Sequence, residues 1–180
     1  MKNNSKINVW SYLDEYNSRR KEILRIVDRV FSSGNLILGR EVKNFELRFA
    51  KYNNCKYAVG VNSGTDAIQI GLMALGVTNG DEVITVSNTA VPTVSAIVSC
   101  GAKPVFVDIS ENDFLIDTNK IEEKITKNTK VIIPVNLYGL SVNYKIIKKI
   151  CMKYNIKILE DCAQSTGSKY LGKMSGSLGH

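Results

Sequence analysis

Short apolar runs and longer segments with apolar residues at helical spacing alternate along most of this chain, and polar turns separate them. The apolar runs predict strands at residues 57–61, 83–86, 105–108, 131–135 and 156–161. The intervening segments predict helices at residues 68–75 and 92–100, a short helix from residue 118 and a longer one that Ser141 caps. This order predicts an α/β fold with a mostly parallel sheet flanked by helices.

Two amphipathic helices precede the predicted sheet. The first is expected over residues 12–32 and ends at Gly34, because glycine readily adopts the left-handed conformation that closes a helix. The second follows a loop at residues 35–40 and carries aromatic residues on one side. We therefore divide the chain into an N-terminal helical segment, residues 1–54, and a main domain, residues 55–180.

The composition is that of a globular domain, with 44% hydrophobic and 23% charged residues. No apolar run approaches the length of a membrane span, and residues 1–6 with Val9 and Trp10 do not resemble a signal peptide. We therefore expect a cytoplasmic protein with no membrane segment. Four widely separated cysteines without a C-x-x-C pair indicate buried free thiols and no metal site.

The formal charge of +7 favours an anionic partner, and nucleic acid is the first class to consider. The lysines are spread along predicted helix surfaces, such as residues 145–153, and no nucleic-acid-binding motif or aromatic–basic interleaving is present. Solvated helix surface explains these lysines better, and an anionic small molecule fits the charge equally well.

Asp161 stands at the carboxyl end of the last predicted strand, before the polar turn at residues 162–168. Ligands of parallel sheets gather at this edge, and a partly buried carboxylate there needs a cationic partner. The pyridinium nitrogen of pyridoxal phosphate is such a partner, because the paired acid keeps the ring protonated. The alternative is that Asp161 only caps the turn, and the local sequence alone favours that alternative.

The turn at residues 62–66 joins the first predicted strand to a helix. Amide groups at a helix N-terminus bind anions, Gly64 allows close approach to the backbone, and Thr65 adds a hydroxyl group. The alternative is an ordinary helix cap made by Ser63 or Asn62. No Gly-Lys-Ser/Thr follows and no G-x-G-x-x-G is present here, which excludes a P-loop and a dinucleotide fingerprint.

Several short motifs together carry a family resemblance. Three stand at the ends of the first, second and last predicted strands: Asn62-Ser-Gly-Thr-Asp66, Ser87-Asn-Thr-Ala-Val-Pro-Thr93 and Glu160-Asp-Cys-Ala-Gln164. Others are Ile37-Leu-Gly39, Gly80-Asp-Glu-Val-Ile84, Gly101-Ala-Lys-Pro-Val-Phe-Val-Asp108, Val135-Asn-Leu-Tyr-Gly139 and Gly172-Lys-Met-Ser-Gly176. In this order they resemble the DegT/StrS family of pyridoxal-phosphate-dependent sugar aminotransferases.

The resemblance implies the large domain of a fold-type I aminotransferase, with pyridoxal 5′-phosphate as cofactor and a homodimer as the assembly. Carried over by position, Gly64 and Thr65 hold the cofactor phosphate, and Asp161 is the catalytic residue that faces the pyridine nitrogen. Gln164 lies near the phenolic oxygen of the ring. No metal is implied.

The chain departs from the family pattern at two places. Ala90 stands where many relatives carry an aromatic residue that stacks on the cofactor, and relatives that share Asn-Thr-Ala-Val-Pro-Thr are linked to amination at sugar carbon 3. The lysine that forms the Schiff base follows the Gly-Ser-Leu-Gly segment in the family, so that lysine and the smaller C-terminal domain are expected to be absent. Lys169 and Lys173 precede that position, and His180 falls too early for the histidine of related dehydratases.

The resemblance implies the N-terminal part of an enzyme that transfers an amino group, from glutamate, to a nucleotide-linked keto-deoxysugar in deoxysugar or cell-surface polysaccharide biosynthesis. We expect this chain alone to be inactive because it lacks the Schiff-base lysine. The alternatives are a fragment of a cofactor-dependent sugar dehydratase and a non-catalytic remnant.

Overall fold

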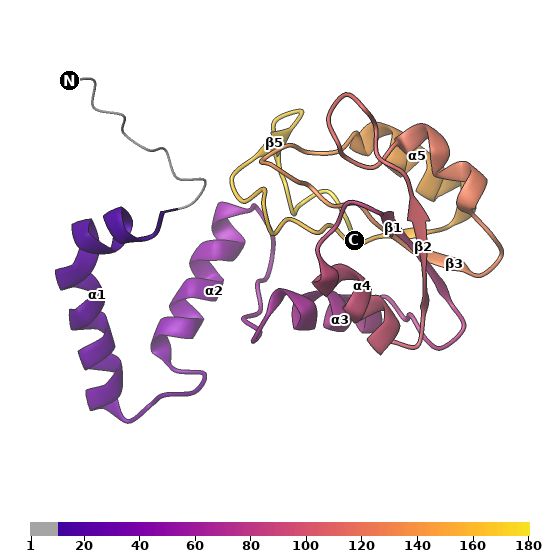
Figure 1. The fold of residues 1–180 in the computed structure, drawn as a ribbon. Helices are drawn as coiled ribbons and strands as arrows, with labels where there is room; N and C mark the ends of the chain where they lie inside the picture. Colours follow the sequence, from indigo (N-terminus) through magenta and orange to yellow (C-terminus); the bar gives the residue numbers. More distant parts are fainter. Residues whose placement is uncertain (1–10) are drawn as a thin grey trace, which may run out of the picture. The chain divides into compact units, whose positions relative to one another are not determined.

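The computed structural model describes residues 11–180 and forms two compact units, one up to Leu47 and the other Arg48–His180 (Figure 1). The expectations about residues 1–6, Val9 and Trp10 lie outside the described residues, as does the start of the predicted segment 1–54.

The N-terminal unit contains helix α1 (Leu13–Ser33) and most of α2 (Arg40–Tyr52), which confirms both predicted helices. Gly34 closes α1 with φ 70°, and its N–H donates to the Phe31 carbonyl at 3.2 Å. An ion pair of 2.8 Å between Arg29 and Glu41 links α1 to the start of α2. No residue of α1 is buried.

The second unit is built on a four-stranded sheet, which confirms the predicted fold class. Its strands are β1 (Glu82–Val86), β2 (Lys103–Val107), β3 (Thr129–Ile133) and β4 (Lys157–Ile158). They lie in the order β2-β1-β3-β4, and each neighbouring pair is parallel. All residues of β1 are buried, as expected for a central strand covered on both faces.

Helices cover both faces of the sheet (Figure 1). Helices α3 (Gly64–Ala74) and α4 (Val91–Ser99) pack side by side on one face, where Leu72 and Ile97 meet Val83. Helix α5 (Tyr144–Tyr154) covers the other face with Ile147, next to Ile84. Neighbouring residues of β1 thus face opposite cores, because successive strand side chains point to opposite sides. Two short 3₁₀ helices, η1 (Thr118–Lys120) and η2 (Glu122–Lys124), precede β3.

The prediction of a strand at residues 57–61 is wrong. This segment takes part in none of the strand ladders of the described chain, and Tyr57 and Val59 are 73% and 78% exposed. Alternating apolar residues favour extended backbone, but a strand also requires a neighbour that supplies its hydrogen bonds. The predicted cap of α5 is also wrong, because Asn143 rather than Ser141 accepts from the backbone N–H of Ile146.

The glycine-rich segment near the C-terminus forms a small hairpin of strands β5 (Lys169–Tyr170) and β6 (Lys173–Met174). Leu171 and Gly172 make its turn, and both have positive φ, 49° and 81°. Such a turn ordinarily carries Asn-Gly, because a β-carbon is disfavoured in the left-handed region.

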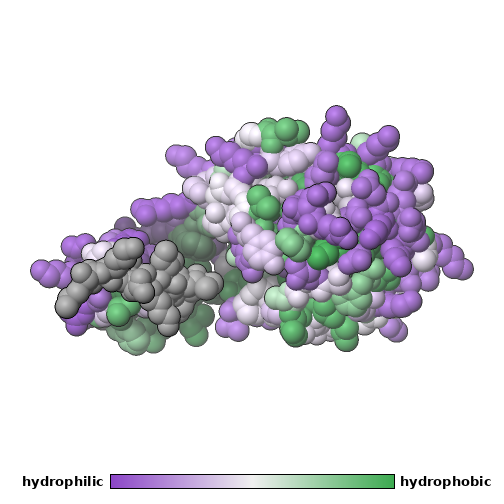
Figure 2. All heavy atoms as spheres, turned by 45° about the horizontal axis from the view of Figure 1, so that its top comes forward, coloured by the Kyte–Doolittle hydropathy of each residue, from purple (hydrophilic) through white to green (hydrophobic). Residues whose placement is uncertain are grey.

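The surface of the second unit is largely hydrophilic in the view of Figure 2, with smaller apolar patches between the polar side chains. Lys145, Lys149 and Lys153 of α5 are exposed, which agrees with the interpretation of these lysines as solvated helix surface. All four cysteines are free, but only Cys151 is fully buried. No helix within residues 11–180 combines the length and apolar character needed to cross a bilayer.

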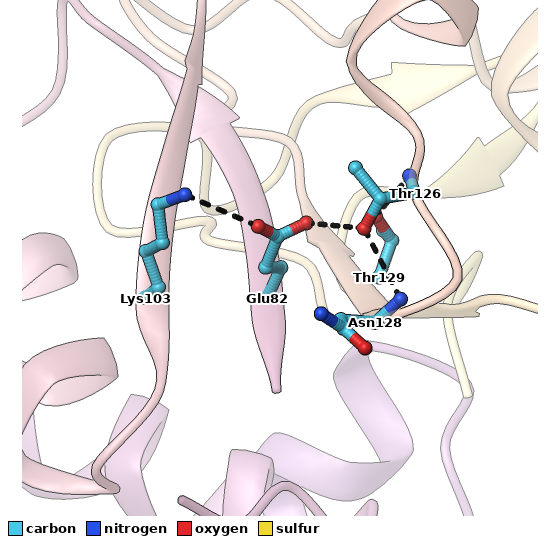
Figure 3. Close-up of polar contacts among 5 residues, drawn as sticks. All are labelled: Glu82, Lys103, Thr126, Asn128 and Thr129. Atoms are coloured by element: carbon cyan, nitrogen blue, oxygen red, sulfur yellow. Dashed lines mark hydrogen bonds and ion pairs between the residues drawn. The ribbon is translucent and has the colours of Figure 1, made fainter. Parts of the chain in front are cut away.

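A buried carboxylate ties the amino ends of the strands together (Figure 3). Glu82, at the start of β1, accepts from the Thr126 hydroxyl at 2.6 Å and from the Lys103 ammonium at 3.3 Å. The hydrogen bond from Thr126 lowers the pKa of Glu82, burial opposes that effect, and Lys103 adds to it. The charged form of Glu82 therefore stabilises the fold.

We expect Glu82→Gln to lower the free energy of unfolding by about 1–2 kcal/mol at neutral pH. Because the folded state depresses the pKa of Glu82, its contribution is present above the ordinary glutamate pKa and is lost as pH falls through the folded value. The difference between variant and unchanged protein, measured by urea unfolding, should therefore shrink below about pH 4.3. Lys103→Met is the control, since this ammonium is exposed and its loss should cost less than about 0.5 kcal/mol. A stability difference that persists below this pH would contradict a stabilising role for the charged carboxylate of Glu82.

Candidate active site

Asp161 lies at the carboxyl edge of the parallel sheet, just beyond β4. Its backbone pairs with the segment that follows β3: its N–H donates to the Pro134 carbonyl at 3.1 Å, and its carbonyl accepts from Asn136 at 2.9 Å. The residue is 9% exposed. The structure therefore places this acid, nearly buried, at the edge where parallel sheets bind ligands.

Two groups orient the carboxylate of Asp161. Oδ1 accepts from the backbone N–H of Ala163 at 3.2 Å, which is the turn-capping contact considered above. Oδ2 accepts from the hydroxyl of Thr93 at 2.8 Å, from helix α4. The cap to Ala163 uses Oδ1 only, and Oδ2 is held by Thr93 from another element. Capping of the turn is therefore compatible with a role for Asp161 toward a ligand.

Sequence reasoning missed Thr93, the residue that orients Asp161. It is 1% exposed, and its hydroxyl also lies 2.8 Å from that of Thr89. A carboxylate oxygen can only accept, so Thr93 gives its single proton to Asp161 and must accept from Thr89. The result is a directed chain of hydrogen bonds, from Thr89 through Thr93 to Asp161.

We expect Thr93→Val to lower the free energy of unfolding by about 1–2 kcal/mol, because it leaves a buried carboxylate oxygen without its donor while keeping the shape of the side chain. Thr93→Ser retains the hydroxyl and should recover most of this loss. Thr89→Val should cost less, since Thr89 is only half-buried. Denaturant unfolding of the three variants checks the order. A larger loss for Thr93→Ser than for Thr93→Val would show that the methyl group, which valine keeps, matters more than the hydroxyl.

The first turn of α3 is both a capped helix start and a possible anion site. Ser63 caps the helix by accepting from the Asp66 N–H at 3.1 Å, as one of the two sequence interpretations required. That contact leaves the N–H groups of Gly64 and Thr65 without a protein acceptor among residues 11–180. A β-carbon built on Gly64 would meet nothing within 4 Å, so this turn is open to an approaching anion.

Helix α3 also lies against the segment that leads to Asp161. A β-carbon on Gly71 would come within 3.0 Å of the Leu159 side chain, and α3 packs along α4, which carries Thr93. The first turn of α3 and Asp161 thus belong to elements that pack on one another.

Gln164 joins two loops at the carboxyl edge. Its side-chain Oε1 accepts from the Tyr138 N–H at 3.2 Å, and its backbone carbonyl accepts from Gly139 at 3.0 Å. The loop after β4 is thereby fixed to the loop after β3. Gln164 is exposed, and its side-chain amide nitrogen donates to no group in the described chain.

Glu160, next to Asp161, anchors the C-terminal glycine-rich segment. Its Oε2 accepts from the Gly176 N–H at 2.9 Å, and its Oε1 accepts from the N–H groups of Gly179, at 2.6 Å, and Leu178. Sequence reasoning missed this role, because nothing in the local pattern connects Glu160 to residues 176–179.

Asn136 is a second buried residue near Asp161 whose role sequence reasoning missed. It is fully buried, and its amide nitrogen donates to the Tyr144 hydroxyl and to Ser175, both at 2.9 Å. Its side-chain oxygen accepts from the Val142 N–H at 3.0 Å. A fully bonded buried amide of this kind rigidifies its surroundings.

Cys162 follows Asp161 and is the nearest candidate nucleophile in the sequence. Burial raises the pKa of its thiol, and the charge of Glu160 raises it further. Because the thiolate is the reactive form, the structure favours an inert thiol over covalent catalysis by this residue.

These features can be compared with known proteins. A model of the DegT/DnrJ/EryC1/StrS aminotransferase family matches residues 17–180. The chain belongs to this family. The match confirms the family indicated by the strand-end motifs, and the sheet confirms the expected fold of the fold-type I aminotransferases.

Two curated relatives from this family are sugar transaminases. The chain is 46% identical over 170 residues to the dTDP-3-amino-3,4,6-trideoxy-alpha-D-glucose transaminase of Micromonospora megalomicea subsp. nigra, covering 94% of this chain and 46% of that protein. It is 48% identical over 160 residues to the dTDP-3-amino-3,6-dideoxy-alpha-D-galactopyranose transaminase of Aneurinibacillus thermoaerophilus, covering 89% and 44%. The chain therefore spans less than half the length of these DegT/DnrJ/EryC1/StrS relatives.

A solved structure shows the same arrangement of elements. The crystal structure of ntda from Bacillus subtilis with bound cofactor PMP superimposes with a TM-score of 0.86 at 38% sequence identity. The superposition covers 96% of this chain and 40% of that one. The similarity thus extends over nearly all of the present chain.

Proposed function

We propose that this chain is the cofactor-binding part of an aminotransferase that uses pyridoxal 5′-phosphate and acts on a nucleotide-linked keto-deoxysugar. Glutamate is the proposed amino donor, and the complete protein is proposed to be a cytoplasmic homodimer with a smaller C-terminal domain beyond the helical segment 1–54 and the domain 55–180. The names of both curated relatives contain a 3-amino sugar, which supports amination at sugar carbon 3.

The single observation that carries the proposal is the buried, oriented carboxylate of Asp161 at the carboxyl edge of the sheet. Such a group favours a cationic partner, and Thr93 and Ala163 each occupy only one acceptor position, on Oδ2 and Oδ1 respectively. The open amides of Gly64 and Thr65 suit a phosphate group on the neighbouring helix α3. A ligand with a protonated ring nitrogen and a phosphate, such as the cofactor, fits both features.

When bound, the cofactor would supply an electron-accepting ring for reactions at an amine-bearing carbon. Asp161 would hold the proton on the ring nitrogen, and Thr93 would keep the carboxylate oriented for this contact. Gly64 and Thr65 would bind the phosphate through their N–H groups. Gln164, whose amide nitrogen donates to no group in the described chain, would donate to the phenolic oxygen of the ring.

We also propose that this chain alone does not catalyse the amino transfer. Within residues 11–180, no lysine forms a hydrogen bond or ion pair with Asp161, Thr93 or Gln164. Lys169 and Lys173 are exposed on the β5–β6 hairpin. We expect the Schiff-base lysine to come from a segment that this chain does not contain.

A chimera tests the proposed reaction directly. Residues 1–180 are joined to the remaining C-terminal part of the M. megalomicea transaminase, which this chain matches at 46% identity. Incubated with pyridoxal phosphate, ¹⁵N-labelled glutamate and a dTDP-linked 3-keto-6-deoxyhexose, the chimera should produce a ¹⁵N-labelled amino sugar, detected by mass spectrometry. The same chimera with Asp161→Ala should produce none. A folded chimera that binds the cofactor but transfers no nitrogen would refute the proposed function.

A further inference from the structure

Two exposed aromatic residues stand at the carboxyl edge of the sheet in an unfavourable backbone conformation. Tyr138, after β3, has φ 57° and is 63% exposed, and Phe114, in the loop after β2, has φ 60° and is 53% exposed. Left-handed backbone is disfavoured for a bulky side chain, and exposure of a large ring adds no core packing in return. Residues held in this way cluster at functional sites.

Tyrosine is not the residue that the backbone conformation at position 138 favours. The Leu140 N–H donates to the Leu137 carbonyl at 2.8 Å, and both central residues, Tyr138 and Gly139, have positive φ. This is a type I′ turn, for which asparagine is the favoured residue at the first central position. Tyrosine at this position therefore points to a use of its side chain.

Asn88 connects the two aromatic residues to each other. Its side-chain nitrogen donates to the Phe114 carbonyl at 3.4 Å and to the Tyr138 hydroxyl at 3.5 Å. In the described chain, its side-chain oxygen accepts no hydrogen bond. The three residues come from the loops after β1, β2 and β3, so they gather at one edge of the sheet.

This cluster is continuous with the candidate active site. Thr89, the neighbour of Asn88, begins the hydrogen-bond chain to Asp161, and the backbone N–H of Tyr138 is bound by the side chain of Gln164. A molecule that reacts beside Asp161 and Gln164 would therefore extend over Tyr138.

We propose that Tyr138, Phe114 and Asn88 form the platform that binds the hexose ring of the substrate. This inference rests on the proposed function and deepens it. A deoxyhexose presents C–H and methyl groups that pack on aromatic rings, and it retains hydroxyl groups that donate to the free oxygen of Asn88. The nucleobase is less suitable as the occupant, because the sugar, not the base, must reach the group that reacts next to Asp161.

The test compares two probes, dTDP and dTDP-6-deoxy-α-D-glucose, by isothermal titration calorimetry of the protein with and without pyridoxamine phosphate. The unchanged protein should bind the sugar-linked probe more tightly than dTDP. Tyr138→Asn should reduce this preference by about 3- to 10-fold, which corresponds to the loss of one aromatic contact. It should also raise the thermal midpoint by about 2–4 °C, because asparagine relieves the backbone strain.

Leu171→Asn is the matched control. Leu171 occupies the same position of the β5–β6 turn, with φ 49° and 80% exposure. It should give a similar thermal gain and leave the preference for the sugar unchanged. Phe114→Asn is a second variant that should weaken sugar binding, so that the result does not depend on Tyr138 alone.

Each outcome decides the proposal. Three results would overturn the platform. The first is an unchanged preference for the sugar-linked probe in both Tyr138→Asn and Phe114→Asn. The second is equal weakening of both probes, which indicates base binding, and the third is no preference for the sugar in the unchanged protein. Failure of the unchanged protein to bind pyridoxamine phosphate would count against the proposed function instead. Pyridoxamine phosphate binding together with an unaltered sugar preference in the variants would overturn the platform alone.

Discussion

Asp161→Asn lowers the affinity of the protein for pyridoxamine phosphate by about 30-fold or more, because the variant meets a protonated ring nitrogen with a neutral amide. Removing one member of a buried, hydrogen-bonded charge pair costs about 2–5 kcal/mol, which sets the lower bound of this expectation. The amide keeps the size of the carboxylate, so the loss should come from charge. Fluorescence titration with pyridoxamine phosphate measures the affinity of each variant.

Asp28→Asn is the matched control for this experiment, since Asp28 is an exposed carboxylate on α1. It changes net charge by the same amount and should leave the affinity unchanged. Equal affinities for Asp161→Asn and the unchanged protein, with both proteins folded by circular dichroism, would show that Asp161 serves only to cap its turn.

Glu160→Gln should destabilise the folded protein by about 2–3 kcal/mol. The carboxylate accepts from three backbone N–H groups, those of Gly176, Leu178 and Gly179, and hydrogen bonds to a charged acceptor contribute more than neutral ones. The glutamine side chain has one acceptor oxygen, and its NH₂ group would face backbone N–H groups that also donate. Urea unfolding measures the loss of stability, and hydrogen exchange at the three amides should accelerate.

The control for this variant is Glu122→Gln. Glu122 forms an ion pair of 2.8 Å with Lys153, but both side chains are about half exposed, at 45% and 61%. Its loss should cost far less than the loss of Glu160, because solvent screens an exposed ion pair. If Glu160→Gln were equally mild and the amides of residues 176–179 stayed protected, the segment would be held by other contacts.

Much of the architecture follows from local patterns. The strands β1 and β3 carry apolar runs, Val83–Ile84 and Val131–Ile133, because both faces of the sheet are covered there, and these runs are visible without coordinates. Gly34 ends α1, and Ser63 begins α3, through contacts that span three residues of the chain. The failure at residues 57–61 has the opposite cause, since pairing depends on a distant neighbour that the local pattern does not specify.

The candidate site divides in the same way. Sequence predicted that Asp161 ends a strand and that Gly64 and Thr65 lie in the turn that leads into a helix. In the structure, Asp161 forms an isolated bridge beyond β4, and α3 begins at Gly64 itself. The sequence did not reveal Thr93, which donates to Asp161 across 68 residues, or the hold of Glu160 on residues 176–179. It also did not single out Tyr138, because the strain there becomes visible only when φ is known.

By itself, the sequence determined the alternation of strands and helices, the caps, and the acid at the edge of the sheet, since each depends on side-chain periodicity or on contacts within a few residues. The tertiary structure alone decided which hydroxyl orients that acid, which amides surround Glu160, and which rings gather beside Gln164. These contacts join residues from different loops, and only the pairing order β2-β1-β3-β4 and the packing of α4 bring them together.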